Sequence, residues 1–288
     1  MRCVVVILVF ILMASDALFS QKRIPEQDPK VESESEMIER HLRNLKLIEV
    51  PSTKEKLPAD VKHLYRRASS DDLSTLTPTV AASTQYAAFL EQPYTGIFKL
   101  NGNVHCSNDT DVISEECSKY KIPGSGTAYS FRFRGHRIPR LADLSLRGDL
   151  MVTEAVLQLG VMVSLGNVKI EDISLESRGM KFLTELVPPR DKAAFLDVDN
   201  KVHAGVKQDG FSYGTGFYAK AQQTYALRAI AFKGTEPRSE NGVVYDEFLF
   251  DERKDVIVVF RITDIDGDGN VTMVWKQLMR QESPKLKL

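Results

Sequence analysis

The stretch 155–177 has the pattern of a β-hairpin and constrains the fold more than any other part of the chain. Between positions 155 and 165 every odd residue is apolar, and most even residues are polar or small. This period of two puts the apolar side chains on one face of a strand. Gly166-Asn167 suits a tight turn, and the alternation resumes at Val168, with a change of phase at Asp172 that is typical of a bulge. The sequence therefore predicts two antiparallel strands here.

Other segments of the chain also have strand patterns. The remaining segments expected to form strands are 96–105, 129–133, 142–147, 202–206, 243–250, 256–262 and 271–278. Residues 225–232 are nearly all apolar, which indicates either a strand covered on both faces or a buried helical segment. Turn residues separate these short segments, and no regular alternation of strands with helices recurs. The expected fold class is therefore mainly β, an antiparallel β-sandwich or barrel with a short helical N-terminal extension.

Residues 1–20 have the layout of a secretory signal peptide. Arg2 supplies a positive charge, residues 3–13 are uniformly apolar, and small residues follow as far as Ser20. Cleavage after Ala17 or after Ser20 fits the pattern. The alternative is an uncleaved membrane anchor, but the apolar run is shorter than a membrane-spanning helix requires. We therefore expect a secreted or periplasmic protein with no transmembrane segment after the signal is removed.

Residues 21–92 are expected to form a helical and linker extension ahead of the β-rich domain. A capping box at 33–36 indicates the start of an amphipathic helix, and a second short helix is predicted at 59–68. Residues 69–84 are rich in serine, threonine and aspartate, which favours a linker. The β-rich domain then covers residues 93–280, and residues 281–288 form a polar tail.

Export determines how the cysteines are interpreted. Cys3 would leave with the signal peptide, so the mature chain would keep Cys106 and Cys117. In an oxidising compartment, two thiols this close in sequence favour a structural disulfide. The alternative is a metal site that adds His105 and His136 to the two cysteines, but no ligand spacing typical of zinc supports it.

Residues 264–270 resemble the first half of an EF-hand calcium loop. Asp264, Asp266 and Asp268 alternate and are followed by a glycine and Asn270, so their oxygens could converge on a hard cation. The position of the bidentate carboxylate is occupied by Trp275, and the flanking segments have strand patterns. The alternative is a turn between two strands, where aspartate, glycine and asparagine are the usual residues. Calcium bound here would hold the hairpin together.

The basic residues between 132 and 140 form the one basic cluster of the chain. Its members are Arg132, Arg134, His136, Arg137 and Arg140. The first of them alternate with aromatic residues that would enter the core, so these arginines are expected to face away from it. They could bind an anionic partner such as a phosphorylated or carboxylated glycan, or they could form an ordinary solvated strand face.

Two patterns would support a secreted hydrolase. Residues 210–214 match the G-x-S-x-G pattern around Ser212, but every histidine precedes this serine and the preceding segment is mostly polar. Asp191, Asp197 and Asp199 could pair as catalytic carboxylates, although nothing in the sequence fixes their separation. Neither pattern meets the requirements of its own catalytic arrangement.

The net charge and these motifs together favour a protein that binds rather than catalyses. The chain has 38 basic and 39 acidic side chains and a net charge of −1, which gives no long-range attraction to nucleic acid. We expect an exported, non-enzymatic binding or structural protein of the cell envelope or extracellular space. Its partner would be a protein, a glycan or an apolar ligand. The alternatives are a secreted hydrolase that uses the acidic residues or Ser212, and a calcium-stabilised adhesion-type domain.

Overall fold

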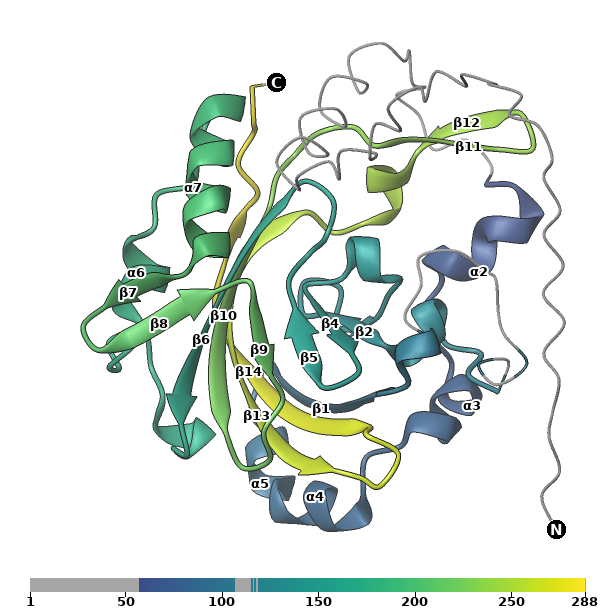
Figure 1. The fold of residues 1–288 in the computed structure, drawn as a ribbon. Helices are drawn as coiled ribbons and strands as arrows, with labels where there is room; N and C mark the ends of the chain where they lie inside the picture. Colours follow the sequence, from purple (N-terminus) through teal and green to yellow (C-terminus); the bar gives the residue numbers. More distant parts are fainter. Residues whose placement is uncertain (1–56, 107–114, 116, 118, 288) are drawn as a thin grey trace, which may run out of the picture.

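The protein is built mainly from two antiparallel β-sheets that pack face to face. The structure is a computed structural model that describes residues 57–106, 115, 117 and 119–287. The larger sheet has seven strands and curves around the smaller sheet, which has five and lies on its concave side (Figure 1). The fold is therefore mainly β and sandwich-like, as the sequence predicts. The predicted signal peptide and the helix predicted from the capping box at 33–36 lie outside the described residues.

The seven-stranded sheet supplies the centre of the fold. In spatial order its strands are β1 (Thr95–Leu100), β14 (Val271–Glu282), β13 (Lys254–Ile265), β10 (Thr224–Ala231), β6 (Gln158–Gly166), β8 (Phe211–Gly214) and β7 (Val206–Gln208). Every residue of β10 is buried, because this strand has a neighbour on each side and a packed layer on each face. This resolves residues 225–232 as a strand covered on both faces.

The five-stranded sheet lies in the concavity of the larger one. In spatial order its strands are β3 (Gly135–His136), β2 (Ala128–Ser130), β4 (Leu144–Arg147), β5 (Leu150–Val152) and β9 (Gly216–Tyr218). A separate ribbon is formed by β11 (Pro237–Glu240) and β12 (Val243–Asp246). The strands of the small sheet have only two to four residues, so the sheet depends on its packing against the larger one.

The core between the two sheets is rich in aromatic side chains. Phe131 contacts Phe260 and Trp275 of the larger sheet at ring-centroid distances of 6.0 and 5.4 Å. Phe98 of β1 stacks on Tyr129 of β2 at 3.8 Å with nearly parallel rings. Aromatic contacts of this kind add to the stabilisation that comes from buried area alone.

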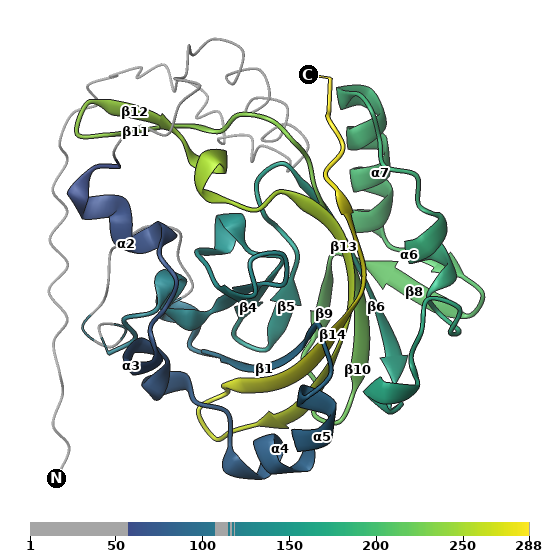
Figure 2. The ribbon, with the colours of Figure 1, turned by 180° about the vertical axis from the view of Figure 1, so that it is seen from behind.

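The convex face of the large sheet is covered by two helices and several short turns. Figures 1 and 2 both place α6 (Lys181–Glu185) and α7 (Lys192–Ala204) outside this face. Phe195 and Val202 of α7 are buried in the same apolar cluster as Val161 and Val163 of β6. Alternate residues of the central strands therefore enter two different cores, one on each face of the sheet.

The remaining helical elements are short. The N-terminal segment contains the helices α2 (Lys62–Tyr65), α3 (Ser70–Leu73), α4 (Val80–Gln85) and α5 (Ala87–Leu90) and the 3-10 turns η2 (Ala59–Val61) and η3 (Ser74–Leu76). Further 3-10 turns are η4 (Val104–Cys106), η5 (Pro123–Gly126), η6 (Pro139–Leu141), η7 (Ile170–Asp172) and η8 (Glu247–Phe250).

The prediction of a linker at 69–84 is wrong. Ser69 caps α3 in a reciprocal capping box with Asp72, and Thr79 caps α4. Leu76 and Ala82 are buried. The serines, threonines and aspartates in this stretch therefore begin helices instead of keeping the chain extended, because the same side chains serve turns and helix N-termini.

The hairpin predicted at 155–177 is only half present. Its first strand is β6, but β6 pairs with β10 and β8 instead of with the segment that follows it. The chain leaves the sheet after Gly166 and forms the 3-10 turn η7, which buries Ile170 and Ile173 against the convex face. The change of phase at Asp172 reflects this three-residue turn instead of a bulge, since residues three apart share a face of a 3-10 turn.

Two further segments differ from their predicted structure. The strand expected at 202–206 is mostly the end of α7, and β7 begins only at Val206. Asp191 caps the start of α7 by accepting a hydrogen bond from the backbone of Ala194 at 2.9 Å. Phe195 and Val202 are seven positions apart, which places them on the same face of the helix. The polar tail at 281–288 also takes part in the fold, because Ser283 and Leu286 are buried.

Candidate functional site

The predicted disulfide is confirmed. Cys106 and Cys117 are bonded, with their Cα atoms 5.5 Å apart. Both are buried in a small apolar cluster with Leu76, Tyr120 and Ile122. His136 belongs to a different cluster, beside Phe98 and Tyr129, and therefore does not complete a metal site with the cysteines.

The expectation that the arginines of the basic cluster face solvent is wrong for most of them. Arg132 and Arg137 are 1% and 0% exposed. The reason is local, because β2 ends at Ser130 and the chain turns at 131–134 instead of continuing as a strand. The alternation of arginine with phenylalanine therefore does not correspond to two faces of a sheet, and only Arg134 is exposed.

The buried arginines belong to a network of ion pairs inside the protein. Arg132 pairs with Asp143 at 2.6 Å and with Asp251 at 3.3 Å, and Arg253 also reaches Asp251 at 3.2 Å. Burial alone would lower the pKa of Arg132, but the two carboxylates outweigh it and raise that pKa above its usual value. The network links the turn after β2 to the segment before β13. The role of these arginines is therefore structural.

Arg137 and Arg140 also hold neighbouring segments together, Arg137 through hydrogen bonds to the backbone and Arg140 through ion pairs. The guanidinium of Arg137 donates to the backbone carbonyls of Tyr65 and Phe250 at 3.0 and 2.7 Å. Arg140 pairs with Glu236 at 2.7 Å and with Glu247 at 2.9 Å. Three of the four arginines predicted to bind a partner are therefore engaged in contacts inside the fold.

The candidate calcium loop is the turn between β13 and β14. The Asp266 carboxylate accepts hydrogen bonds from the backbone of Asp268 and Asn270, and it pairs with Lys99 at 2.6 Å. The amide of Asn270 also donates to Asp266. No group of three or more histidine, cysteine, aspartate or glutamate side chains in the described part of the chain is placed to hold a metal ion. Calcium binding by Asp264 and its neighbours stays a prediction.

The candidate hydrolase residues have separate local roles. Asp191 caps α7, Asp197 pairs with Lys201 one turn along the helix, and Asp199 lies 3.5 Å from His203. Ser212 is an exposed residue of β8, and its hydroxyl has no hydrogen-bond partner among the described residues. The structure therefore does not join this serine to an acid and a histidine through hydrogen bonds.

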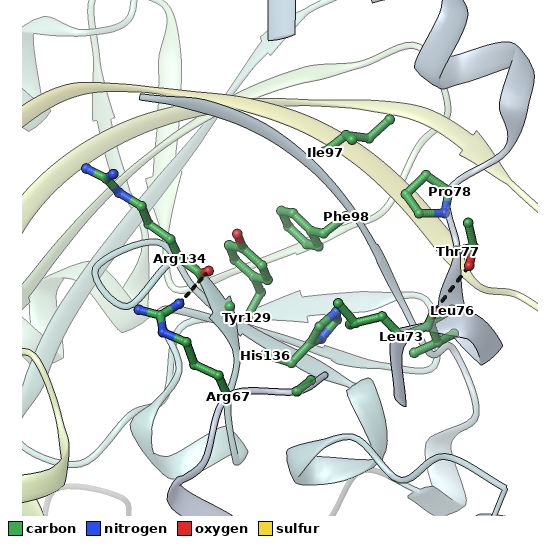
Figure 3. Close-up of a pocket in the computed structure, with 12 residues that line it drawn as sticks. Arg67, Leu73, Leu76, Thr77, Pro78, Ile97, Phe98, Tyr129, Arg134 and His136 are labelled. Carbon is green, nitrogen blue, oxygen red and sulfur yellow. Dashed lines mark hydrogen bonds between the residues drawn. The ribbon is translucent and has the colours of Figure 1, made fainter. Parts of the chain in front are cut away.

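A pocket of about 320 Å³ lies where the edges of the two sheets meet. β1 is an edge strand of the larger sheet and β3 is an edge strand of the smaller one. The chain between Arg67 and Pro78 covers the gap between them. Figure 3 shows the residues that line the pocket, which are Arg67, Ala68, Leu73, Leu76, Thr77, Pro78, Ile97, Phe98, Tyr129, Arg134, Gly135 and His136.

The two ends of this edge pocket differ in character. The arginines Arg67 and Arg134 lie on one side of Tyr129, while Leu73, Leu76 and Pro78 lie on the other side of the pocket (Figure 3). The pocket therefore has a cationic end and an apolar end, with aromatic rings between them.

Neither guanidinium at the cationic end has a carboxylate partner among the described residues. Arg67 donates to the backbone carbonyl of Arg134 at 3.2 Å and lies over the ring of Phe133 at 4.0 Å. Arg134 lies 5.0 Å from the ring of Tyr94. These contacts hold the two side chains in place and leave most of their donors available.

His136 and Tyr129 are neutral groups in the middle of the pocket. Burial raises the pKa of the Tyr129 hydroxyl, although the nearby Arg67 and Arg134 act in the opposite direction. Burial lowers the pKa of His136 to about 4. At neutral pH both side chains therefore contribute hydrogen-bonding atoms without charge.

We expect His136 to make the protein sensitive to mild acid. The unfolded chain takes up a proton near pH 6.5 and the folded chain only near pH 4, so the unfolded state binds more protons between these values. The free energy of unfolding should therefore fall by about 2 kcal/mol more in the wild type than in His136→Phe when the pH drops from about 7 to about 4.5. Urea unfolding of both proteins at the two pH values measures this difference. Equal losses in the two proteins would contradict it.

Comparisons with protein-family models, with curated proteins and with solved structures found no match to this chain. Among the described residues, no helix has both the length and the hydrophobicity needed to cross a membrane. The functional argument therefore rests on the fold and on the edge pocket.

Proposed function

We propose that this chain is an exported, non-enzymatic binding protein whose edge pocket takes a small organic anion with an aromatic or apolar body. The observation that carries the proposal is the pair Arg67 and Arg134, whose guanidiniums have no carboxylate partner among the described residues and lie at one end of a mostly apolar and aromatic pocket. Export rests on the N-terminal sequence pattern.

The size of the pocket supports a small ligand. Ligand sites in proteins commonly measure about 300–1,000 Å³, so a volume of about 320 Å³ is at the lower end of that range. A single aromatic ring or a short aliphatic chain with one charged group is of suitable size. Phe98, Tyr129 and Ile97 would provide the apolar surface for the body of such a ligand.

The charges at the pocket support an anion with a planar acidic group. A guanidinium presents several N–H donors in a fixed fork, which matches the two oxygens of a carboxylate. Arg67 and Arg134 both add positive charge to this end of the pocket, which favours an anionic ligand there. Arg66, next in the chain, pairs with Asp72, whereas Arg67 and Arg134 have no carboxylate partner in the part of the chain that the structure describes.

We expect the paired variant Arg67→Gln/Arg134→Gln to bind an arylalkanoate probe about tenfold more weakly than the wild type. The probe is hydrocinnamate, a phenyl ring joined to a carboxylate by a short chain. Isothermal titration calorimetry gives the affinity, and added salt should weaken binding to the wild type more than to the variant.

Arg178→Gln provides a matched control. Arg178 is an exposed arginine that lies over the ring of Phe211, outside the residues that line the edge pocket. This variant should bind hydrocinnamate as the wild type does. If hydrocinnamate does not bind, or if the paired variant binds it equally well, the proposed anion site is wrong.

A further inference from the structure

The buried imidazole of His136 has one nitrogen engaged in the fold and one that is not. Its Nδ1 lies 3.2 Å from the backbone carbonyl oxygen of Ala128. Its ring is nearly perpendicular to those of Phe98 and Tyr129, at centroid distances of 6.3 and 5.6 Å. No described residue forms a hydrogen bond with Nε2, and the side chain lines the edge pocket although the residue is only 4% exposed.

The contact with Ala128 determines which nitrogen carries the proton. A carbonyl oxygen only accepts hydrogen bonds, so Nδ1 must donate and therefore holds the hydrogen. In the neutral ring Nε2 is then an acceptor with a lone pair. The low pKa of His136 keeps the ring neutral over the whole physiological range. Nε2 is not one of the fully buried unpaired atoms of the described residues, and His136 lines the edge pocket, so water or a ligand there can donate to it. A ligand that displaces this water without donating loses the hydrogen bond.

We propose that Nε2 of His136 accepts a hydrogen bond from a hydroxyl or N–H group on the body of the bound anion, and so selects hydroxylated or amino-substituted organic acids over the plain ones. This inference rests on the proposed function of the edge pocket. It assigns His136 as a specificity-determining residue and defines the ligand as a molecule with three features: an anionic group, an apolar or aromatic body, and a hydrogen-bond donor on that body.

The remaining wall of the pocket supports this assignment. Around His136 the lining side chains are the apolar Leu73, Leu76 and Phe98. The other polar side chains that line the pocket nearby are Tyr129 and Thr77, and the Thr77 hydroxyl already donates to backbone carbonyls of its own segment. Among these groups Nε2 is an acceptor that cannot also donate, so it favours a ligand group that carries a hydrogen. A ligand without a donor leaves Nε2 unpaired when it displaces water from the pocket. This free-energy cost favours ligands that carry a donor over ligands that do not.

The test compares ligands that differ in one donor. Hydrocinnamate, its meta-hydroxy and para-hydroxy derivatives, and the corresponding methoxy derivatives are titrated into the wild-type protein. We expect at least one hydroxy derivative to bind about two- to tenfold more tightly than hydrocinnamate and more tightly than its methoxy counterpart, which retains the oxygen but cannot donate. If neither hydroxy derivative gains affinity while hydrocinnamate binds, the role of His136 is overturned and the anion site remains.

The variant His136→Phe tests whether Nε2 causes the preference for the hydroxy derivative. It keeps a planar ring but removes Nε2, together with the Nδ1 bond to Ala128. The readout is therefore the ratio of the affinities for the hydroxy derivative and for hydrocinnamate, which should fall to about one whatever the change in the affinity for hydrocinnamate itself. A preference that persists in this variant would overturn the proposal.

Nitrogen NMR of the wild-type imidazole gives a second measurement that does not depend on a variant. The Nε2 resonance should move on addition of the hydroxy derivative and stay in place with hydrocinnamate, and the reverse result would overturn the proposal.

Discussion

Replacing Asp143 with asparagine should lower the free energy of unfolding by about 3–5 kcal/mol. Asp143 is fully buried, and its carboxylate pairs with Arg132 at 2.6 Å while accepting hydrogen bonds from the hydroxyl of Ser130 and the backbone of Arg132. Asparagine has nearly the same shape but no charge. Arg132 would then share Asp251 with Arg253, leaving two buried guanidiniums for one carboxylate.

Chemical unfolding of the wild type and of the Asp143→Asn variant measures this loss. Asp197→Asn is a matched control, because it removes the charge from an exposed pair with Lys201 and should change stability by no more than about 0.5 kcal/mol. The double change Arg132→Met/Asp143→Leu removes both charges and should restore part of the lost stability, since an apolar pair needs no compensation. An Asp143→Asn variant as stable as the wild type would show that the network is not electrostatically coupled.

The central strands could be predicted from sequence because their pattern depends on local composition. β10 and the first part of β13 are runs of mostly apolar residues, and burial on both faces produces such runs wherever the strands lie in the sheet. In β14 only the first five residues are buried, and they are mostly apolar. The sequence of helix α7 also contains a helical pattern, in which the capping residue Asp191 is followed by Phe195 and Val202 at helical spacing. The sequence interpretation missed it because the residues between them are mostly polar or small.

The pocket could not be predicted, because it joins parts of the chain that are distant in sequence. Arg67 and Arg134 are 67 positions apart, and the sequence places Arg67 in a short helix predicted at 59–68 with no motif that links it to Arg134. The burial of the arginines in the basic cluster has a non-local cause beside the local turn at 131–134. Asp251, the shared partner of Arg132 and Arg253, is 119 positions beyond Arg132, and no local pattern links the two. Burial of a charge depends on its partner, which only the tertiary fold supplies.

The disulfide should stabilise the fold and also hold one wall of the edge pocket in place. Cys106 and Cys117 are separated by 11 positions, and a crosslink closing a loop of this length stabilises a protein by about 3 kcal/mol, mainly by restricting the unfolded chain. The cystine also packs against Leu76, and both Ala68 and Leu73 contact the same cluster. These three residues line the edge pocket as well, so one wall of the pocket rests on the disulfide.

We therefore expect the Cys106→Ala/Cys117→Ala variant to lose about 3 kcal/mol of unfolding free energy and to bind hydrocinnamate more weakly than the wild type. The affinity should fall because the segment from Arg67 to Pro78 loses part of the surface that holds it in place, and a ligand must then order this wall as it binds.

Val104→Ala is the control, since Val104 lies in the same 3-10 turn as Cys106 but is 54% exposed and should affect neither quantity. Calorimetric titration and urea unfolding separate the two effects. If stability falls while affinity stays the same, the wall of the pocket is held by contacts other than the cystine, such as the bond from Arg67 to the backbone of Arg134.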